Sequence, residues 1–181
     1  MKNIQRWGLM RKLIPENIQE HSLQVAAVAH MLGVIRNRRF HGDVDLGRLV
    51  ILAMYHDCSE ILTSDLPTPI KLLTPEFEES FKEVDTLMAM RLYATLPEDL
   101  RDEFEWILLD DECNAELHTL LKAADLICSY YKCIEELKLG NNDFENAKGP
   151  IIAALEELNL PEVTDFFEEF GRDLTFPMSN I

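Results

Sequence analysis

The sequence is poor in the features that mark secreted and membrane proteins. Its four cysteines, Cys58, Cys113, Cys128 and Cys133, form no Cys-x-x-Cys pair and lack the dense spacing of small secreted domains. We therefore expect reduced, mostly buried thiols. No secretory apolar segment follows Met1, and no apolar run approaches the roughly 18 residues of a membrane-spanning helix. These absences predict a cytoplasmic protein with no membrane partner.

Positive charge is also scarce. The chain has 17 lysines and arginines against 33 aspartates and glutamates, a formal net charge of -16. Binding to a nucleic-acid polymer depends on lysine and arginine neutralising phosphates, so this balance argues against such a partner. A small anionic substrate remains possible where local cations hold it.

The chain is otherwise built like a globular helical protein. Apolar residues make up 47% of its 181 residues, which is enough for one well-buried domain and short for two. No segment shows a convincing strand alternation or an internal repeat. We predict an all-α fold of about six or seven helices, forming a single domain over residues 1–181. Its core is expected at about residues 6–171, followed by a loosely ordered tail.

The first long helix is predicted from Asn17 to about Phe40. Asn17 and Glu20 have the spacing of a capping box, in which each side chain accepts a backbone N–H of the other residue. His21 then falls on the apolar stripe of this helix, in line with Val25. We expect His21 to point into the core.

A second helix, residues 45–62, is expected to be the central and most buried one. His56 and Asp57 stand side by side within its apolar sequence, and Glu60 follows one turn later on nearly the same face. Burying such groups without partners is unfavourable by several kcal/mol. The pattern therefore predicts either a hydrogen-bond network or a metal ion.

A loop and further helices follow. Residues 63–69 contain two prolines, hydroxyls and Asp65, and should form a stiff loop that is well placed to contact a substrate. Further helices are predicted at about residues 75–95, 97–111, 114–139 and 143–171, the last with a break at Gly149-Pro150.

Asp125 lies in the middle of the helix predicted over residues 114–139. Its neighbours are apolar, so a lone carboxylate there needs a partner. His118 is on the same face but about 10.5 Å away along the helix axis. The two side chains are therefore not expected to bind one ion.

Together these residues resemble a known family. His21, His56-Asp57 and Asp125 match the H…HD…D signature of the HD-domain metal-dependent phosphohydrolases. The flanking sequence narrows the likeness to the YfbR-type 5'-deoxynucleotidases. It is carried by Arg6-Trp7, Glu20 to Val25, Tyr55, Glu60, Asp65-Leu66-Pro67-Thr68-Pro69 and the segment 131–137.

The resemblance implies an HD-domain helical bundle that removes phosphate from 2'-deoxynucleoside 5'-monophosphates. It also implies a homodimer and one divalent cation. The implied roles fall into three sets. The metal ligands are His21, His56, Asp57 and Asp125; the catalytic residues are Glu60, Arg6 and Asp65; and the substrate-binding residues are Arg6, Trp7, His21, Asp65, Leu66, Pro67, Thr68 and Asp125.

The chemistry of this ligand set can be argued from the residues. Two imidazoles and two carboxylates fill four positions of a six-coordinate ion and leave room for water and a phosphoryl oxygen. Imidazoles favour zinc, iron or cobalt and carboxylates favour manganese, so the sequence does not select the metal. Glu60 is placed to take a proton from the attacking water. Arg6 suits a phosphate because its planar fork holds two oxygens.

Alternatives remain open at this stage. Glu60 could be a solvated helix-end residue or a hydrogen-bond partner of His56, and Trp7 could simply cover the core. The enzyme could act on ribonucleotides, a (p)ppGpp-like nucleotide or another phosphoester. A non-catalytic, metal-bearing nucleotide sensor or interaction module is a further alternative, against which the intact Glu60 argues.

Overall fold

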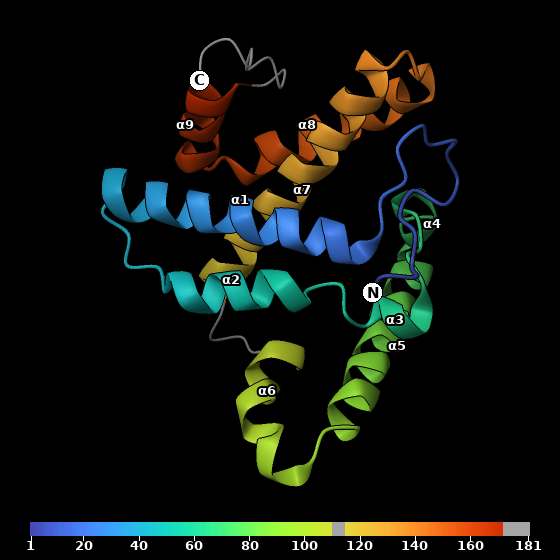
Figure 1. Cartoon of the computed structure of the whole chain (residues 1–181), viewed down its shortest axis with the longest axis vertical. Helices are drawn as coiled ribbons and strands as arrows, with labels where there is room; N and C mark the ends of the chain where they lie inside the picture. The colour runs from blue at the N-terminus through green and yellow to red at the C-terminus, as the bar shows by residue number, and fades with distance from the viewer. Residues whose placement is uncertain (110–114, 172–181) are drawn as a thin grey trace.

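The computed structural model describes residues 1–109 and 115–171, which fold into helices and connecting loops (Figure 1). The helices are α1 (Ile18–Arg39), α2 (Leu46–Tyr55), α3 (Glu60–Thr63), α4 (Thr68–Lys71), α5 (Pro75–Ala94), α6 (Arg101–Leu108), α7 (Ala115–Lys138), α8 (Glu145–Leu158) and α9 (Pro161–Phe170), with the 3-10 helices η1 (Glu98–Leu100) and η3 (Asn142–Phe144). In these ranges the only β pairing is an isolated bridge between Gln5 and Asn17. The predicted all-α class is confirmed.

The start of α1 follows the predicted capping box. The side chain of Asn17 accepts the backbone N–H groups of Gln19 and Glu20, and the Glu20 carboxylate accepts the N–H of Asn17 at 3.2 Å. This cap fixes the first turn, and His21 in that turn is fully buried. The predicted inward direction of His21 is therefore confirmed.

Helices α1 and α2 pack at close range. Gly33 lies at their contact, and a Cβ atom added there would meet Leu46 Cδ2 at 2.6 Å. The absence of a side chain at Gly33 allows this approach, which brings the C-terminal end of α2 beside the N-terminal half of α1 (Figure 1).

The second helix is shorter than predicted. It ends at Tyr55, and a separate short helix, α3, starts at Glu60. The carbonyl of Ala53 accepts the Nδ1–H of His56 at 2.8 Å, and the backbone continues through i to i+3 bonds such as Cys58 N–H to the Tyr55 carbonyl. These tighter turns redirect the chain, so Glu60 is not on one continuous helix with His56.

The prediction that this helix is the most buried was wrong. Three residues of α2 are buried, whereas α7 buries residues along nearly its whole length. The reason is that α7 packs extensively against α1 and α8 and also contacts α2, while α2 packs closely only on α1 and makes smaller contacts with α7 and α6 (Figure 1).

The expected break at Gly149-Pro150 was also wrong. Helix α8 runs through Pro150, and the break falls at Asn159, which has a left-handed backbone with φ 48°. Asparagine tolerates this conformation, and Pro161 starts α9 where its missing N–H is not needed. The expected loose tail and the predicted first residue of the 114–139 helix lie outside the described residues.

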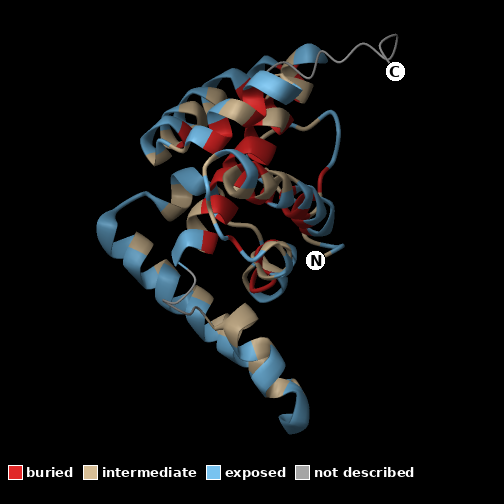
Figure 2. Cartoon of the chain, turned by 90° about the vertical axis from the view of Figure 1, so that its left-hand side faces the viewer, coloured by how far each residue is buried: buried red, intermediate tan, exposed pale blue. Residues whose placement is uncertain are grey.

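Helices α5 and α6 form an arm that projects from the bundle (Figure 2). None of the residues of α5 is buried, although the helix spans Pro75–Ala94, close to the predicted residues 75–95. Ser59 Oγ donates to the carboxylate of Asp85 and so ties the middle of α5 to the turn before α3. Among the described residues, no helix is both long and apolar enough to span a bilayer.

Candidate active site

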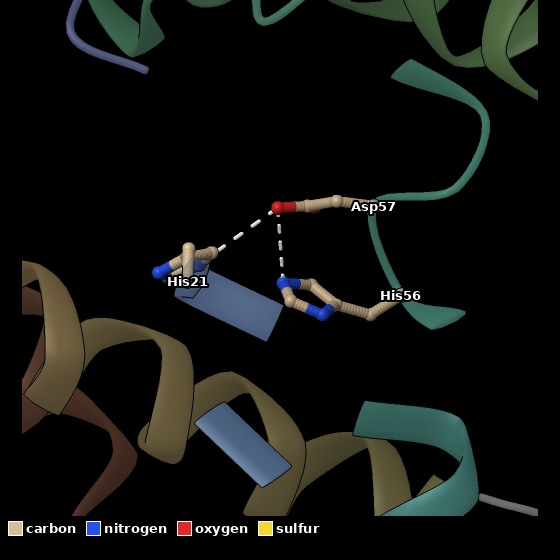
Figure 3. Close-up of side chains that lie close together, drawn as sticks. All are labelled: His21, His56 and Asp57. Carbon is tan, nitrogen blue, oxygen red and sulfur yellow. Dashed lines mark ion pairs between the residues drawn. The ribbon is translucent and has the colours of Figure 1, made fainter. Parts of the chain in front are cut away.

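Three side chains from two elements converge at the junction of α1 and the turn after α2. His21 comes from α1, while His56 and Asp57 follow α2, and Figure 3 shows the Asp57 carboxylate directed toward both imidazoles. Asp57 Oδ2 lies 3.2 Å from His56 Nε2 and 3.8 Å from His21 Nε2. One possible ligand atom from each residue lies within 4.8 Å of the other two. The structure therefore brings together three of the four predicted metal ligands.

The orientation of His56 is fixed by its own backbone. Its Nδ1 donates to the Ala53 carbonyl, so in the neutral ring Nε2 carries a lone pair. That Nε2 atom is buried and faces Asp57 Oδ2 at 3.2 Å. Burial lowers the pKa of His56, but hydrogen bonding and charge from Asp57 outweigh burial and raise it above its ordinary value. The site thus attracts positive charge.

Asp125 joins the cluster through His21. Asp125 Oδ1 lies 3.1 Å from His21 Nε2, and Arg6 Nη1 lies 2.8 Å from Nδ1 of the same ring. Nε2 is also the ring nitrogen that lies 3.8 Å from Asp57 Oδ2, so the same atom of His21 faces both carboxylates. Burial would raise the pKa of Asp125, but the hydrogen bond and charge of His21 hold it far below its ordinary value. The predicted partner of this mid-helix carboxylate is therefore His21.

Glu60 reaches the site from α3. Its side chain is buried, and its Oε2 atom has no hydrogen-bond partner. Lys71 Nζ lies 3.4 Å from the other carboxylate oxygen. Burial and the charge of Asp57 raise the pKa of Glu60 to about 7, although Lys71 opposes this rise. The alternative of a solvated helix-end residue is excluded by the burial.

Arg6 lies at the edge of the cluster. Its guanidinium donates to Glu16 at 2.6 Å and to Ser129 Oγ at 3.4 Å, and it lies 3.8 Å from Asp125. Burial acts to lower the pKa of Arg6, but the carboxylates of Glu16 and Asp125 outweigh burial and raise the pKa above its ordinary value. Arg6 therefore stays positively charged. A fixed planar cation beside the metal-ligand candidates is suited to an anionic group.

Trp7 connects the start of the chain to the proline-containing loop. Its backbone is left-handed, with φ 62°, and its N–H donates to Asp65 Oδ2 at 3.0 Å. Its ring packs on Phe144 with centroids 5.1 Å apart, and its Nε1 is buried without a hydrogen-bond partner. The indole therefore covers part of the core while lying beside Arg6, whose guanidinium carbon is 5.8 Å from the ring centroid.

The loop after α3 is held in place by Asp65. Leu66 and Pro67 follow it and are half-buried, and Thr68 starts α4. The contact of Asp65 with the Trp7 backbone thus brings this predicted substrate loop to the segment that carries Arg6.

The residues fit a divalent cation. His56 Nε2, the ring nitrogen that the backbone does not engage, lies 3.2 Å from Asp57 Oδ2. In the neutral ring this nitrogen carries a lone pair, so it and the carboxylate offer two donor atoms to a cation, and their contact is unfavourable unless a proton or a cation lies there. Imidazole nitrogens and carboxylate oxygens are ligands that zinc, iron, cobalt and manganese accept.

Comparisons with known proteins agree with this geometry. Residues 1–174 match the family described as 5'-deoxynucleotidase YfbR-like. The chain belongs to the YfbR-like 5'-deoxynucleotidase family. A 5'-deoxynucleotidase of Vibrio atlanticus is 43% identical over 181 residues, which is 100% of this chain and 93% of the relative. The 5'-deoxynucleotidase YfbR of Shigella boydii is 45% identical over 170 residues, covering 94% and 85% of the two chains.

Two solved structures share the fold of this YfbR-like chain. An HD-domain phosphohydrolase from Listeria innocua has a TM-score of 0.83 at 24% identity, covering 97% of this chain and 85% of its own. A cyanophage S-2L HD phosphohydrolase, bound to dA and one catalytic Zn2+ ion, has a TM-score of 0.63 at 20% identity, covering 93% and 91%. The predicted HD-domain fold is confirmed.

Three residues of the YfbR-like site were not predicted from the sequence. Glu16 and Ser129 hold the guanidinium of Arg6, and Lys71 pairs with Glu60. Lys71 follows the proline loop and could have been found from that position. Glu16 and Ser129 belong to no recognisable sequence motif. The contact of Ser129 with Arg6 joins residues 123 positions apart, and that of Glu16 depends on how the segment before α1 folds back on itself.

Proposed function

We propose that this protein is a metal-dependent 5'-deoxynucleotidase, which hydrolyses 2'-deoxynucleoside 5'-monophosphates to deoxynucleoside and phosphate. One observation carries the proposal. His21, His56 and Asp57 converge, with Asp125 and Arg6 at their edge, in a member of the YfbR-like 5'-deoxynucleotidase family.

His21, His56, Asp57 and Asp125 would hold one divalent cation. Such an ion supplies Lewis acidity, lowering the pKa of water and drawing charge from phosphoryl oxygens. The cyanophage relative is described with zinc, and zinc, cobalt, iron and manganese all suit the mixed donor set of this chain.

The remaining residues divide the work on the substrate. Arg6 orients the phosphate through its planar guanidinium, which is kept in place by its hydrogen bonds to Glu16 and Ser129. Glu60 takes the proton of the attacking water, since its Oε2 atom is buried without a partner. Arg6 acts in phosphate binding and Glu60 acts in proton transfer. Variants of the two residues can therefore be tested independently.

Recognition of the deoxyribose is assigned to Trp7 and the loop of Asp65, Leu66, Pro67 and Thr68. Trp7 directly follows the phosphate-orienting Arg6, and Asp65 ties the loop to the Trp7 backbone. A sugar attached to a phosphate at Arg6 would then have the indole and the loop as neighbouring walls. His21 and Asp125, which contact Arg6 and each other, would flank the phosphate as well as the metal.

A phosphate-release assay tests this function. The protein is stripped of metal with a chelator, supplied in turn with zinc, cobalt, manganese and iron, and given matched deoxy- and ribonucleoside monophosphates. We expect no release without metal and the highest kcat/KM on deoxynucleoside monophosphates. Equal turnover of both sugars would point to a less selective phosphohydrolase. Full metal occupancy and nucleotide affinity without turnover would support a nucleotide sensor instead.

The assembly is proposed to be a homodimer formed through α5. Phe77, Val84 and Leu87 lie on one face of this helix and are exposed, at 39%, 45% and 51%. A second copy would cover them. Sedimentation at several protein concentrations tests this, with Leu87→Glu expected to shift the protein toward the monomer. A monomer at all concentrations in the unmodified protein would refute it.

The proposed substrate and the free cysteines both suit a cytoplasmic location. We propose a cytoplasmic enzyme, built as one domain, that acts on free nucleotides and not on nucleic-acid polymers. Cys58, Cys128 and Cys133 are buried free thiols, as expected in a reducing compartment. The net charge of -16 disfavours contact with a polyanion.

A further inference from the structure

The C-terminal end of α7 carries a buried polar cluster that the proposed chemistry does not use. It consists of Lys132, Glu136 and Asn141, which are 4%, 0% and 8% exposed. Lys132 and Glu136 belong to the segment 131–137, which contributed to the family resemblance but received no role there. Buried charges need a reason, because removing them from water is costly.

The cluster binds backbone groups of the segment before α1, here called the N-terminal strap (residues 1–16). Glu136 accepts the N–H of Leu13 at 2.9 Å and the N–H of Ile14 at 3.0 Å. Lys132 donates to the Ile14 carbonyl at 2.7 Å. The cluster therefore binds the backbone of the strap and not its side chains.

The three side chains of the cluster also contact one another. Lys132 lies 2.8 Å from Glu136 Oε1, and Asn141 Nδ2 lies 2.8 Å from Glu136 Oε2 and 2.7 Å from the carbonyl of Arg11. Each oxygen of Glu136 thus has two donors. Gly140 follows the end of α7 and has a left-handed backbone, with φ 86°. This turn lets the backbone N–H of Asn141 donate to the Glu136 carbonyl, and it places the Asn141 side chain in the cluster.

Apolar burial does not hold this part of the strap. Leu13 and Ile14 keep 45% and 41% of their surface exposed. Their backbone hydrogen bonds to the cluster are therefore the main attachment. In Figure 1 the dark-blue strap runs beside the orange end of α7 before it turns into α1.

The same strap carries Arg6 and Trp7 at its other end. Arg6 N–H donates to the Glu16 carbonyl at 2.9 Å, and Ile18 N–H donates to the Ile4 carbonyl at 3.0 Å. The strap is thus a loop whose ends are paired and whose middle is fixed on α7. The left-handed backbone of Trp7 is uncommon for such a residue and needs surrounding structure to hold it.

We propose that Lys132, Glu136 and Asn141 form a positioning site that anchors the N-terminal strap and thereby sets the phosphate-binding pose of Arg6. This inference rests on the proposed function, in which Arg6 orients the phosphate. The three residues touch neither the metal-ligand candidates nor the substrate, and they act through the strap alone.

The test uses Glu136→Gln and a matched control, Glu162→Gln. Glu162 is equally buried and lies 3.4 Å from Arg36, but its partner is on α1 and not on the strap. Glu136→Gln should retain metal, expose the Leu13 and Ile14 amides to hydrogen exchange and lower kcat/KM on dAMP by about 10- to 100-fold, the scale of a small misplacement. Glu162→Gln should leave kcat/KM within about 2-fold of the unmodified protein.

A double-mutant cycle with Arg6→Ala separates positioning from general damage. If Glu136 acts through Arg6, Glu136→Gln should have little further effect on kcat/KM when Arg6 is already absent. Additive losses would overturn the proposal, as would equal losses in the Glu136 and Glu162 variants. Should Glu136→Gln fail to fold, Asn141→Ala removes only the contacts to Arg11 and Glu136 and should show a smaller effect of the same kind.

The proposed function and the positioning role fail in different ways. If the unmodified protein with metal releases no phosphate, the function is wrong. Affinity for dAMP, measured by calorimetry, then reports on the pose of Arg6. A Glu136→Gln variant whose strap amides exchange freely while its dAMP affinity is unchanged would overturn the positioning role in that case.

Discussion

The carboxylate of Asp57 lies 3.2 Å from Nε2 of His56, the residue before it. The Nδ1 atom of that ring is committed to the Ala53 carbonyl, so Nε2 is the ring atom that meets this carboxylate in a buried position. The contact is stable when a proton or a metal cation lies between the two atoms. It places two donor atoms that suit a metal ion side by side at this site.

Asp57→Ala should abolish metal binding and activity together. The substitution removes the carboxylate that faces both imidazoles, so His56 loses its carboxylate partner and only Asp125 remains beside His21. Metal content by elemental analysis and phosphate release are the measurements. His30→Ala, an exposed position on the same helix as His21, is the control and should change neither. Stoichiometric metal and near-normal turnover in Asp57→Ala would rule out this ion site.

Chelation should lower the thermal stability of the protein. A ligand present at about 100 times its Kd stabilises the folded state by about 2.7 kcal/mol, provided that it does not bind the unfolded chain. Removing metal should therefore lower the Tm by several degrees, and adding it back should restore it. The Asp57→Ala variant is the control, because its Tm should not respond to the chelator. A Tm that is indifferent to chelation in the unmodified protein would argue against tight metal binding.

Glu60→Gln should separate catalysis from metal binding. Glutamine keeps the shape of the side chain but cannot take a proton, so turnover should fall by at least about 100-fold while metal and substrate still bind. Glu83→Gln, at an exposed position of α5, is a matched control and should retain full activity. If Glu60→Gln loses its metal instead, Glu60 belongs to the ligand set or supports it directly.

Trp7→Ala should weaken the discrimination between deoxy- and ribonucleotides. Removing the indole opens space beside Arg6, so kcat/KM on AMP should rise relative to that on dAMP even if both fall. Walls of this kind discriminate by about 100-fold or more. Trp7→Phe keeps a ring against Phe144 and should change the ratio less. An unchanged ratio in Trp7→Ala would show that the indole only covers the core.

The stability contributed by Glu136 should be lost in acid. Burial alone would raise its pKa, but the donors from Lys132, Asn141, Leu13 and Ile14 lower it from 4.5 to about 2. A lowered carboxyl pKa means that the stabilisation is complete above the unfolded value and disappears as the pH falls through the folded value. The gap in denaturation midpoint between the unmodified protein and Glu136→Gln should therefore be full at pH 7.

That gap should narrow on acidification between about pH 4.5 and about pH 2. Denaturant titrations at pH 7, 4 and 3 provide the measurement. A gap that stays constant or widens over this range would show that the cluster is not held by an ionised Glu136.

Much of the helical fold was accessible from local sequence. Capping residues such as Asn17 and Thr74 and the terminating Gly140 act through neighbouring backbone groups, so their helix ends could be predicted. The inward direction of His21 followed from its place on an apolar stripe. The roles of the site residues and the single-domain organisation stay predictions.

The sequence by itself determined the helical class, because hydrophobic periodicity and helix capping are local properties. The four residues of the metal-ligand signature came from the family resemblance, and their roles stay predictions. Only the tertiary structure decided that Ser129 holds Arg6 and that Glu136 anchors the strap. These contacts join atoms that are close in space but 123 residues apart along the chain. They depend on how the helices pack, and no local pattern of residues encodes that packing.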